Sequence, residues 1–576
     1  MASQIETAQG QQQNDLESPF KESKTDASQI NDHSSEESEP VVTLKTWIVS
    51  AILSCGYGLS FYPIPVMAAI GSELATDFGE PTKYVWFVPA WTIAITCAFL
   101  ILGPNTDLLG RRWFLVGGNL LCAVGHIIVA SAKNANQIIA GLAVAGFGGA
   151  NCQMAAFALP ELLPNKWRHI AVVIADLTVF VAVIVGPVTA RYGYQFGTWY
   201  WNFGSIAICQ FLSFLGLLFL YFPPARPRGI PLVQVLKELD YLGALLFIGG
   251  AVPVLMGIVW AGVYPSNDPH VVATLVVGFT VLIFFALWET FGPVKYHLTP
   301  TSVFTSSWGR DFTAPAVALG VVNMFYYSSS VLWPTMIQVF YSNGGKDWKY
   351  ATVLSLPQGF AIMTGAIFLS VFGGKIRHWH WQLSGSTFIM VLFGSLLGIV
   401  TPTNKGTMIA FLFLSQTGFG WALYLSIAIT QMGVEHHNLG VSGGISGAVR
   451  FAAGSIATAI YTTVFNNSLA NWTTKLIPPA VTAAGLPEDQ LPNLMAALNA
   501  GASALSKFNP SVVSAATEAM NQVYCKAIFI VAMVSFAFGV VGIIACALCK
   551  DVDHKMTNKI EVYLENTELG KKNKFH

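Results

Sequence analysis

The sequence predicts an all-α membrane protein. A helix that crosses a bilayer needs roughly 20 mostly apolar residues, and the chain contains about fourteen such stretches. Of its 576 residues, 53% are hydrophobic and 10% are charged, whereas soluble domains carry roughly 25% charged residues. So little charge could not cover a water-exposed surface of this size, which excludes the soluble class. The formal net charge is zero, so there is no basic footprint for nucleic acid.

The apolar stretches follow one another with mostly short connections. Neighbouring helices should therefore run antiparallel. The expected spans are 47–69, 83–103, 113–132, 137–158, 170–190, 199–222, 240–263, 270–291, 312–335, 350–373, 382–402, 407–431, 440–465 and 524–548.

Both chain ends are expected on the cytoplasmic side. Residues 1–45 are polar and acidic and lack the apolar run of a signal peptide, which predicts a disordered tail. Lys and Arg gather in the short loops that face the cytoplasm if this tail does, and an even helix count also places the tail 550–576 inside. The one long loop, 466–523, then lies outside, and it holds N-x-S/T glycosylation sequons at Asn466 and Asn471.

A compact charged turn, GPNTDLLGRRW, separates the second and third expected helices. Glycines permit unusual backbone angles, and an aspartate can accept hydrogen bonds from backbone or from an arginine. The spacing resembles the signature loop of the major facilitator superfamily, G-x-x-x-D-x-x-G-R-[RK], with Asn105 and Leu108 in place of a usual Leu and a common Arg. The resemblance implies a gate that latches two halves of a transporter at the cytoplasmic side. The matching residues are Gly103, Asp107, Gly110, Arg111 and Arg112.

Three further stretches narrow the resemblance. LPELLPNKWR (159–168), TWYWNFGSI (198–206) with YFPP, and GGISGAVRFAAGSIATAIY (443–461) are similar to the fungal trichothecene efflux pump family, from about residue 45 to the end. The resemblance implies the major facilitator fold, with two six-helix halves plus two extra helices. It divides the chain into a tail at 1–45, a first half at 46–225, the extra pair at 226–295, a second half at 296–549 and a tail at 550–576.

The fifth expected helix carries VAVIVGPVTARYG, which looks like a degenerate antiporter motif. Gly186 and Pro187 are its firm positions. Proline removes a helix hydrogen bond and glycine lets a neighbour approach, so a kink is expected here. A purely structural kink and a role in coupling both fit this pattern.

Two ionisable residues lie inside expected helices, where each costs ~2.5–3.5 kcal/mol at the bilayer centre. Asp176 is on the fifth helix and Arg450 on the thirteenth. In a fourteen-helix member these helices occupy equivalent places in the two halves and line the cavity. The two residues are candidates for proton coupling and could form a pair. A structural pair that fixes helix packing is the alternative.

Polar and aromatic side chains within the helices are candidates for substrate binding. Interhelical hydrogen bonds explain the polar ones equally well. Glu161 and Glu289 are expected at helix ends, and His126 is expected as a packing residue. The substrate-binding candidates are Tyr57, Tyr62, Gln153, Asn323, Gln358, Gln416 and Tyr424.

Patterns typical of enzymes lack their structural context. GVSGG (440–444) fits G-x-S-x-G, but a hydrolase elbow needs a preceding strand. EHH (435–437) has no further ligands nearby, and no phosphate-binding GxxxxGK[ST] occurs. We therefore expect no enzymatic activity, cofactor or metal, and transport driven by an ion gradient, most simply of protons.

The functional expectation is a proton-coupled antiporter that exports an amphipathic, terpenoid-like toxin or drug by alternating access. Such a protein would confer drug resistance as a monomeric, multi-pass glycoprotein of the plasma membrane, with a vacuolar or vesicular membrane as the alternative. Its partners would be the small-molecule substrate, protons and the lipid bilayer. Two alternatives remain at this point: uptake of a siderophore-iron complex, and a receptor that uses the same fold without transporting.

Overall fold

The computed structural model describes residues 42–223, 231–265, 267–342, 347–500, 505, 508–562 and 564. All of these belong to one compact unit, Pro40–His576. The tail expected at 1–45 lies outside the described residues apart from its last four, and so does the final stretch 565–576. Fourteen helices of the described part are long and apolar enough to cross a membrane, which confirms the predicted fold class.

The first half contains six of these spans. Most of the predicted boundaries agree with the structure within several residues. Three spans consist of two consecutive helices, with the interruptions at Tyr62, Met154 and Asp176. The helices are α1 Leu44–Phe61 with α2 Pro63–Asp77, α3 Phe87–Leu109, α4 Arg112–Ala130, α5 Ala135–Gln153 with α6 Ala155–Glu161, α7 Arg168–Ala175 with α8 Leu177–Gln195, and α9 Trp201–Leu220.

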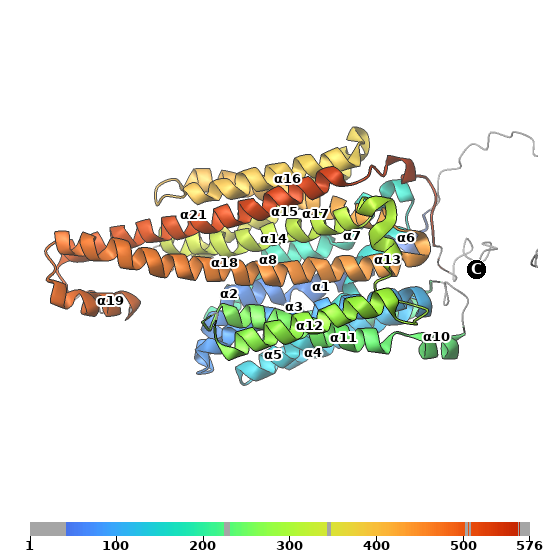
Figure 1. The fold of residues 1–576 in the computed structure, drawn as a ribbon, viewed down its shortest axis with the longest axis horizontal. Helices are drawn as coiled ribbons and strands as arrows, with labels where there is room; N and C mark the ends of the chain where they lie inside the picture. Colours follow the sequence, from blue (N-terminus) through green and yellow to red (C-terminus); the bar gives the residue numbers. More distant parts are fainter. Residues whose placement is uncertain are drawn as a thin grey trace, which may run out of the picture. The chain divides into compact units, whose positions relative to one another are not determined.

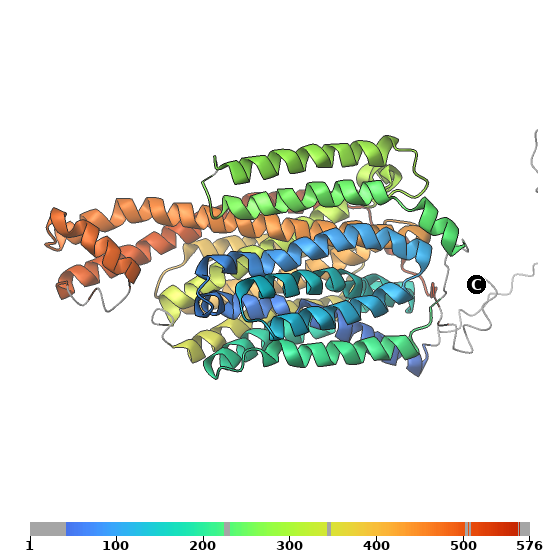
Figure 2. The same cartoon turned by 90° about the horizontal axis from the view of Figure 1, so that it is seen from below.

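The second half follows an additional helix pair. Figure 2 shows this pair, α11 and α12, side by side at one edge of the bundle. The helices from here to the end of the chain are α10 Leu232–Glu238, α11 Tyr241–Ala261, α12 Pro269–Phe291, α13 Thr301–Thr305, α14 Thr313–Met336, α15 Trp348–Ile376, α16 Trp379–Leu396, α17 Lys405–Met432, α18 Leu439–Ala483, α19 Leu491–Ala500 and α21 Pro510–Leu548.

The fifth span has an interruption that the sequence does not predict. The sequence predicts its kink at Gly186 and Pro187. In the structure the helix is interrupted at Asp176, which ends α7 and precedes α8, whereas α8 continues through Pro187. The backbone of Asp176 stays hydrogen-bonded: its amide donates to the carbonyl of Val172 at 3.1 Å, and its carbonyl accepts from the amide of Val179 at 2.9 Å, so the chain makes a tighter turn here.

Most of the segment 466–523 is helical, not irregular. Helix α18 has 45 residues and α21 has 39, and both extend beyond the other helices at the left of Figure 1. Helix α19 lies between them in the chain. An apolar cluster separate from the main core holds the extension together; it includes Ile477, Val481, Leu494, Ala516 and Val523.

The two halves meet along α3 and α18, and small residues bring these two backbones together. A Cβ atom placed on Gly103 would lie 2.4 Å from the Cα atom of Gly444. Glycine alone permits such an approach. We call the end of the bundle where α3 finishes at Leu109 the motif end, and the opposite end, where α2 finishes at Asp77, the far end.

Candidate functional site

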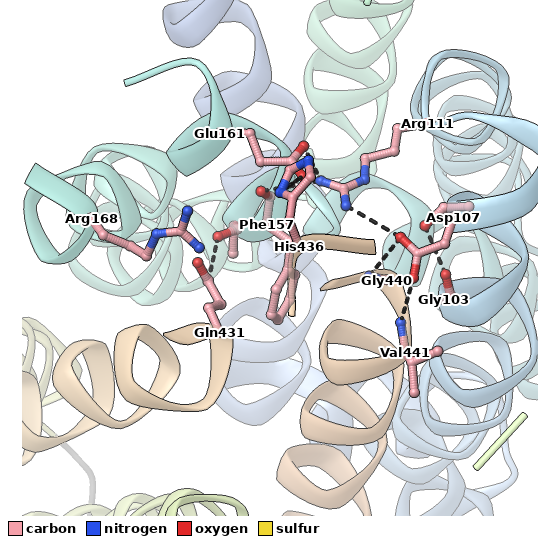
Figure 3. Close-up of polar contacts among 12 residues, drawn as sticks. Gly103, Asp107, Arg111, Phe157, Glu161, Arg168, Gln431, His436, Gly440 and Val441 are labelled. Carbon is pink, nitrogen blue, oxygen red and sulfur yellow. Dashed lines mark hydrogen bonds and ion pairs between the residues drawn. The ribbon is translucent and has the colours of Figure 1, made fainter. Parts of the chain in front are cut away.

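At the motif end, Asp107 joins the first half to the second. It lies in the last turn of α3, it is buried, and its carboxylate faces the first turn of α18. Oδ1 accepts a hydrogen bond from the amide of Gly440 at 2.8 Å, and Oδ2 accepts one from the amide of Val441 at 3.1 Å (Figure 3). The first amides of a helix lack partners within it and carry the positive end of its dipole, so a carboxylate stabilises them.

The first arginine of the motif extends this contact to α6. Arg111 lies beside Asp107, with 3.4 Å between Nη2 and Oδ1, and it forms an ion pair with Glu161. Burial alone would lower the pKa of Arg111, but Glu161 and Asp107 outweigh that effect and raise it. Glu161 also faces His436, just before α18, at 3.6 Å. Asp107, Arg111 and Glu161 therefore form one buried charged group at the junction of the two halves.

The other motif residues support the turn. Gly110 ends α3 with a φ of 83°, a backbone conformation that residues other than glycine rarely adopt. Arg112 makes its contacts outside this charged group: its Nη2 donates to the carbonyl of Leu218 at 2.9 Å, and its guanidinium lies 3.9 Å from the ring centre of Phe222. The sequence pairs the two arginines, but the structure places only Arg111 at the junction of the halves.

Glu161 is the residue of this site that sequence reasoning missed. It was expected at a helix end facing headgroups or capping a neighbour, and the structure places it in the ion pair with Arg111. The second and fourth expected spans end on the same side of the membrane. This placement of Glu161 beside the charged turn is the signal in the sequence that could have identified it.

Deeper in the bundle, two ionisable residues are each bonded to a tyrosine of the opposite half. The hydroxyl of Tyr424 on α17 donates to Oδ2 of Asp176 at 2.5 Å. Nη1 of Arg450 on α18 donates to the hydroxyl of Tyr57 on α1 at 2.9 Å. Asp176 and Arg450 interact electrostatically, but no direct ion pair joins them in the described part of the chain. The expected pair is therefore a group of four side chains.

A small cavity adjoins this group, and a larger cavity shares part of its lining. The smaller, about 30 Å³, is lined by Asp176, Tyr424 and Arg450 together with Asn323 and several aromatic rings. The larger, about 260 Å³, is lined by residues near the far ends of α2, α8, α14 and α15. Both share Val183 and Tyr326. The lining rings that the sequence did not single out are Phe61, Phe180, Tyr326, Tyr327, Phe419, Phe451, Trp333 and Trp348.

Three substrate-binding candidates meet at the centre. Tyr57 and Tyr424 bond to the charged residues there, and Nδ2 of Asn323 donates to the carbonyl of Arg450 at 2.6 Å. Gln153 donates to Ser60 at 3.3 Å and lines a minor cavity beside Tyr57.

The remaining candidates lie apart from the central group. Gln358 lines the larger cavity. Tyr62 is bonded to Thr189 at 2.6 Å, inside the first half, and Gln416 to Ser329 at 2.8 Å, inside the second. Neither lines the two larger cavities.

The residues of the antiporter-type motif lie near the larger cavity. Pro187 lines it. Gly186 faces Pro65, where an added Cβ would come within 3.3 Å of the proline ring.

Asn466 and Asn471 are exposed on α18, within the helical extension at the far end.

One group with the donors of a metal site occurs among the described residues. Asp240, Glu289 and His297 offer ligand atoms within 4.8 Å of one another. The oxygens of Asp240 already accept bonds from the amide of Gly243 at 2.7 Å and from the indole of Trp288 at 3.0 and 3.2 Å. The chain's own N–H groups thus stabilise this carboxylate where α11 begins beside the end of α12.

Comparison with known proteins agrees with this geometry. The family model of the fungal trichothecene efflux pump (TRI12) matches residues 40–574. The chain belongs to this family. The family match and the 14 candidate spans make the chain a multi-pass membrane transporter with the fold of the major facilitator superfamily.

Individual relatives of this efflux pump family member are transporters as well. An "MFS-type transporter prx5" of Penicillium rubens is 68% identical over 524 residues, covering 91% of this chain and 94% of that one. A "Trichothecene efflux pump TRI12" of Fusarium sporotrichioides is 23% identical, covering 88% and 87%. The solved structure of the human organic anion transporter MFSD10 (TETRAN) shares the fold, with a TM-score of 0.50 at 12% identity over 88% of this chain and 98% of that one.

Proposed function

We propose that this protein exports amphipathic toxins or drugs in exchange for protons, by alternating access. In this proposal the half 46–225 moves relative to the half 296–549, and the extra pair 226–295 stays at the edge of the bundle. The observation that carries the proposal is the pair of crossed contacts, Asp176 with Tyr424 and Arg450 with Tyr57. Each joins an ionisable residue of one half to a tyrosine of the other.

These contacts link charge to conformation. When the halves rearrange, Asp176 loses Tyr424 and Arg450 loses Tyr57. Oδ1 of Asp176 has no hydrogen-bond partner among the described residues. A buried carboxylate deprived of partners is costly as an anion, and binding a proton removes that cost. Protonation of Asp176 would therefore favour the state in which the crossed contacts are broken.

The contacts at the motif end suggest which side is closed. Asp107, Arg111 and Glu161 hold the halves together there, whereas the larger cavity lies toward the far end. With the motif end in the cytoplasm, as the loop charges predict, this is a state closed to the cell interior. The plasma membrane is the proposed location.

The cavity lining supports an amphipathic substrate. Aromatic rings make up half of the lining of the smaller cavity, beside Asn323. The larger cavity combines apolar side chains with polar ones such as Gln358 and with the ion pair of Glu73 and Arg191, so the two together suit a substrate with apolar and polar parts. Relatives named trichothecene efflux pumps suggest a terpenoid of that class. Siderophore-iron uptake, the first alternative from the sequence, receives no support from these relatives.

A flux assay tests this proposal. The purified protein is placed in vesicles with and without a proton gradient, with a trichothecene, other amphipathic toxins and a ferric siderophore as substrates. We expect accumulation of an amphipathic compound that the gradient accelerates, and an Asp176→Asn protein whose flux depends less on pH. Binding without flux would favour a receptor on the same fold. Gradient-driven flux that is equally pH-sensitive in Asp176→Asn would end the coupling role of Asp176.

A further inference from the structure

The chain continues along the bundle after α21 ends. Residues 549–562, which we call the C-terminal segment, lie at the motif end. Cys549, Val552 and Ile560 are buried, at 1%, 4% and 8% exposure. Cys549 and Val552 belong to the same apolar core as the residues of both halves. Burial of these side chains fixes the segment against the protein.

The first part of the C-terminal segment, 550–555, bonds to the second half. Lys555 lies at the end of α17, where unpaired carbonyls and the negative end of the helix dipole attract a cation. The polar contacts with this half are Lys550 N with Arg310 O at 3.2 Å, His380 Nδ1 with Asp551 Oδ2 at 3.1 Å, Trp379 Nε1 with Asp553 Oδ1 at 3.2 Å, and Lys555 Nζ with Met432 O at 2.5 Å.

The second part, 557–562, contacts the first half. Three of its four bonds join backbone to backbone, so they do not depend on side-chain identity. The bonds are Lys166 N with Thr557 O at 2.7 Å, Asn165 N with Lys559 O at 3.0 Å, Val562 N with Glu161 O at 3.0 Å, and Asn165 Nδ2 with Glu561 Oε1 at 2.9 Å.

The segment therefore crosses from one half to the other between Lys555 and Thr557. Glu161, which accepts the bond from Val562, is also the ion-pair partner of Arg111. If the halves part at the motif end, the segment cannot keep both sets of bonds. Its contacts favour the closed state and are lost in the open one.

We propose that the C-terminal segment is a built-in clamp that holds the motif end closed and sets how readily it opens. This inference rests on the proposed alternating access. Releasing the segment from residues 161–166 shifts the balance of states toward an open motif end without altering the cavities or the crossed contacts.

Hydrogen exchange in the intact protein tests the clamp without any flux measurement. The amides of Gly440 and Val441 are protected by Asp107, so their exchange reports opening of the motif end. We compare the full-length protein in nanodiscs with a protein that ends after Lys555. Loss of four hydrogen bonds should accelerate exchange of these amides by at least about tenfold, while the core of α4 stays protected. Unchanged exchange in a truncated protein that melts at the full-length temperature would overturn the clamp.

A single substitution covers the case in which the shortened chain fails to fold. Val562→Pro removes the N–H that bonds Glu161, whereas Val562→Ala keeps it. The proline variant should accelerate exchange at Gly440 severalfold and the alanine variant should leave it unchanged. Equal exchange in the two variants would overturn the proposal. Absence of flux in every variant, wild type included, would instead count against the proposed function, because the exchange result does not depend on transport.

Discussion

Asp107 and Gly440 are 333 positions apart in the chain, yet Oδ1 of the aspartate accepts a hydrogen bond from the amide of the glycine at 2.8 Å. The bond places an anion against the N-terminus of α18, where the helix dipole stabilises it. The neighbouring amide of Val441 adds a second bond. Any movement that separates the halves at the motif end has to break both bonds, so variants here test the gate directly.

Asp107→Asn should insert normally but transport about tenfold more slowly. The amide keeps one acceptor oxygen but loses the charge that the end of α18 and Arg111 stabilise, an effect of roughly 0.5–2 kcal/mol. Vesicle flux and hydrogen exchange at Gly440 are the measurements. Asn105→Leu is the control, because the side chain of Asn105 bonds within its own helix, to the carbonyl of Ile101 at 2.8 Å. A wild-type rate in Asp107→Asn would reduce the motif to a structural turn.

Gly103→Ala should destabilise the closed motif end. The added Cβ would meet the backbone of Gly444 at 2.4 Å, and such overpacking typically costs ~1–3 kcal/mol. Gly117→Ala is the matched control, since an added Cβ there has no neighbour within 4 Å among the described residues. We expect the amide of Gly440 to exchange faster than in the wild type in Gly103→Ala and at the wild-type rate in Gly117→Ala. Equal exchange rates at Gly440 in the two variants would show that the close contact between Gly103 and Gly444 does not stabilise the closed motif end.

Tyr424→Phe should slow transport several-fold while leaving the fold intact. It removes the hydroxyl that donates to Asp176 at 2.5 Å. A hydrogen bond to a charged group is worth ~1.5–3 kcal/mol. Tyr461→Phe is the control, because its buried hydroxyl has no partner among the residues described. Flux and melting temperature are measured together. A lower melting temperature with unchanged flux would assign the bond between Tyr424 and Asp176 to stability alone.

Asn466 and Asn471 should be glycosylated if the far end faces the lumen of the secretory pathway. Both are exposed on the extension of α18. Treatment with an endoglycosidase should increase gel mobility, and the double Asn→Gln variant should migrate at the treated position without treatment. Labelling of a tag in 466–523 from the cytosol alone would reverse the proposed topology.

The sequence by itself determined the membrane class, the fourteen spans and the family. Hydropathy over roughly 20 residues is a local property, because each helix must satisfy its backbone internally and present apolar side chains to lipid. The charged turn at Gly103–Arg112 was equally visible, because its glycines, aspartate and arginines lie within one loop. The sequence loses its apolar character near residue 466, so the predicted span ends there. The helix itself continues to Ala483. Helix α18 continues because it packs on α21 through the cluster around Val481 and Val523.

Only the tertiary structure decided which side chains meet. The sequence offered Asp176 and Arg450 as a possible pair, and packing brings a tyrosine of the opposite half to each of them. Arg111 and Arg112 are adjacent in sequence, but the first binds Asp107 and Glu161 where the halves meet, and the second packs against α9 and Phe222. The C-terminal segment reads as a polar tail, yet it bonds residues 161–166. Such contacts join positions up to several hundred residues apart, and they form only where helix packing brings the backbones together, which local composition does not encode.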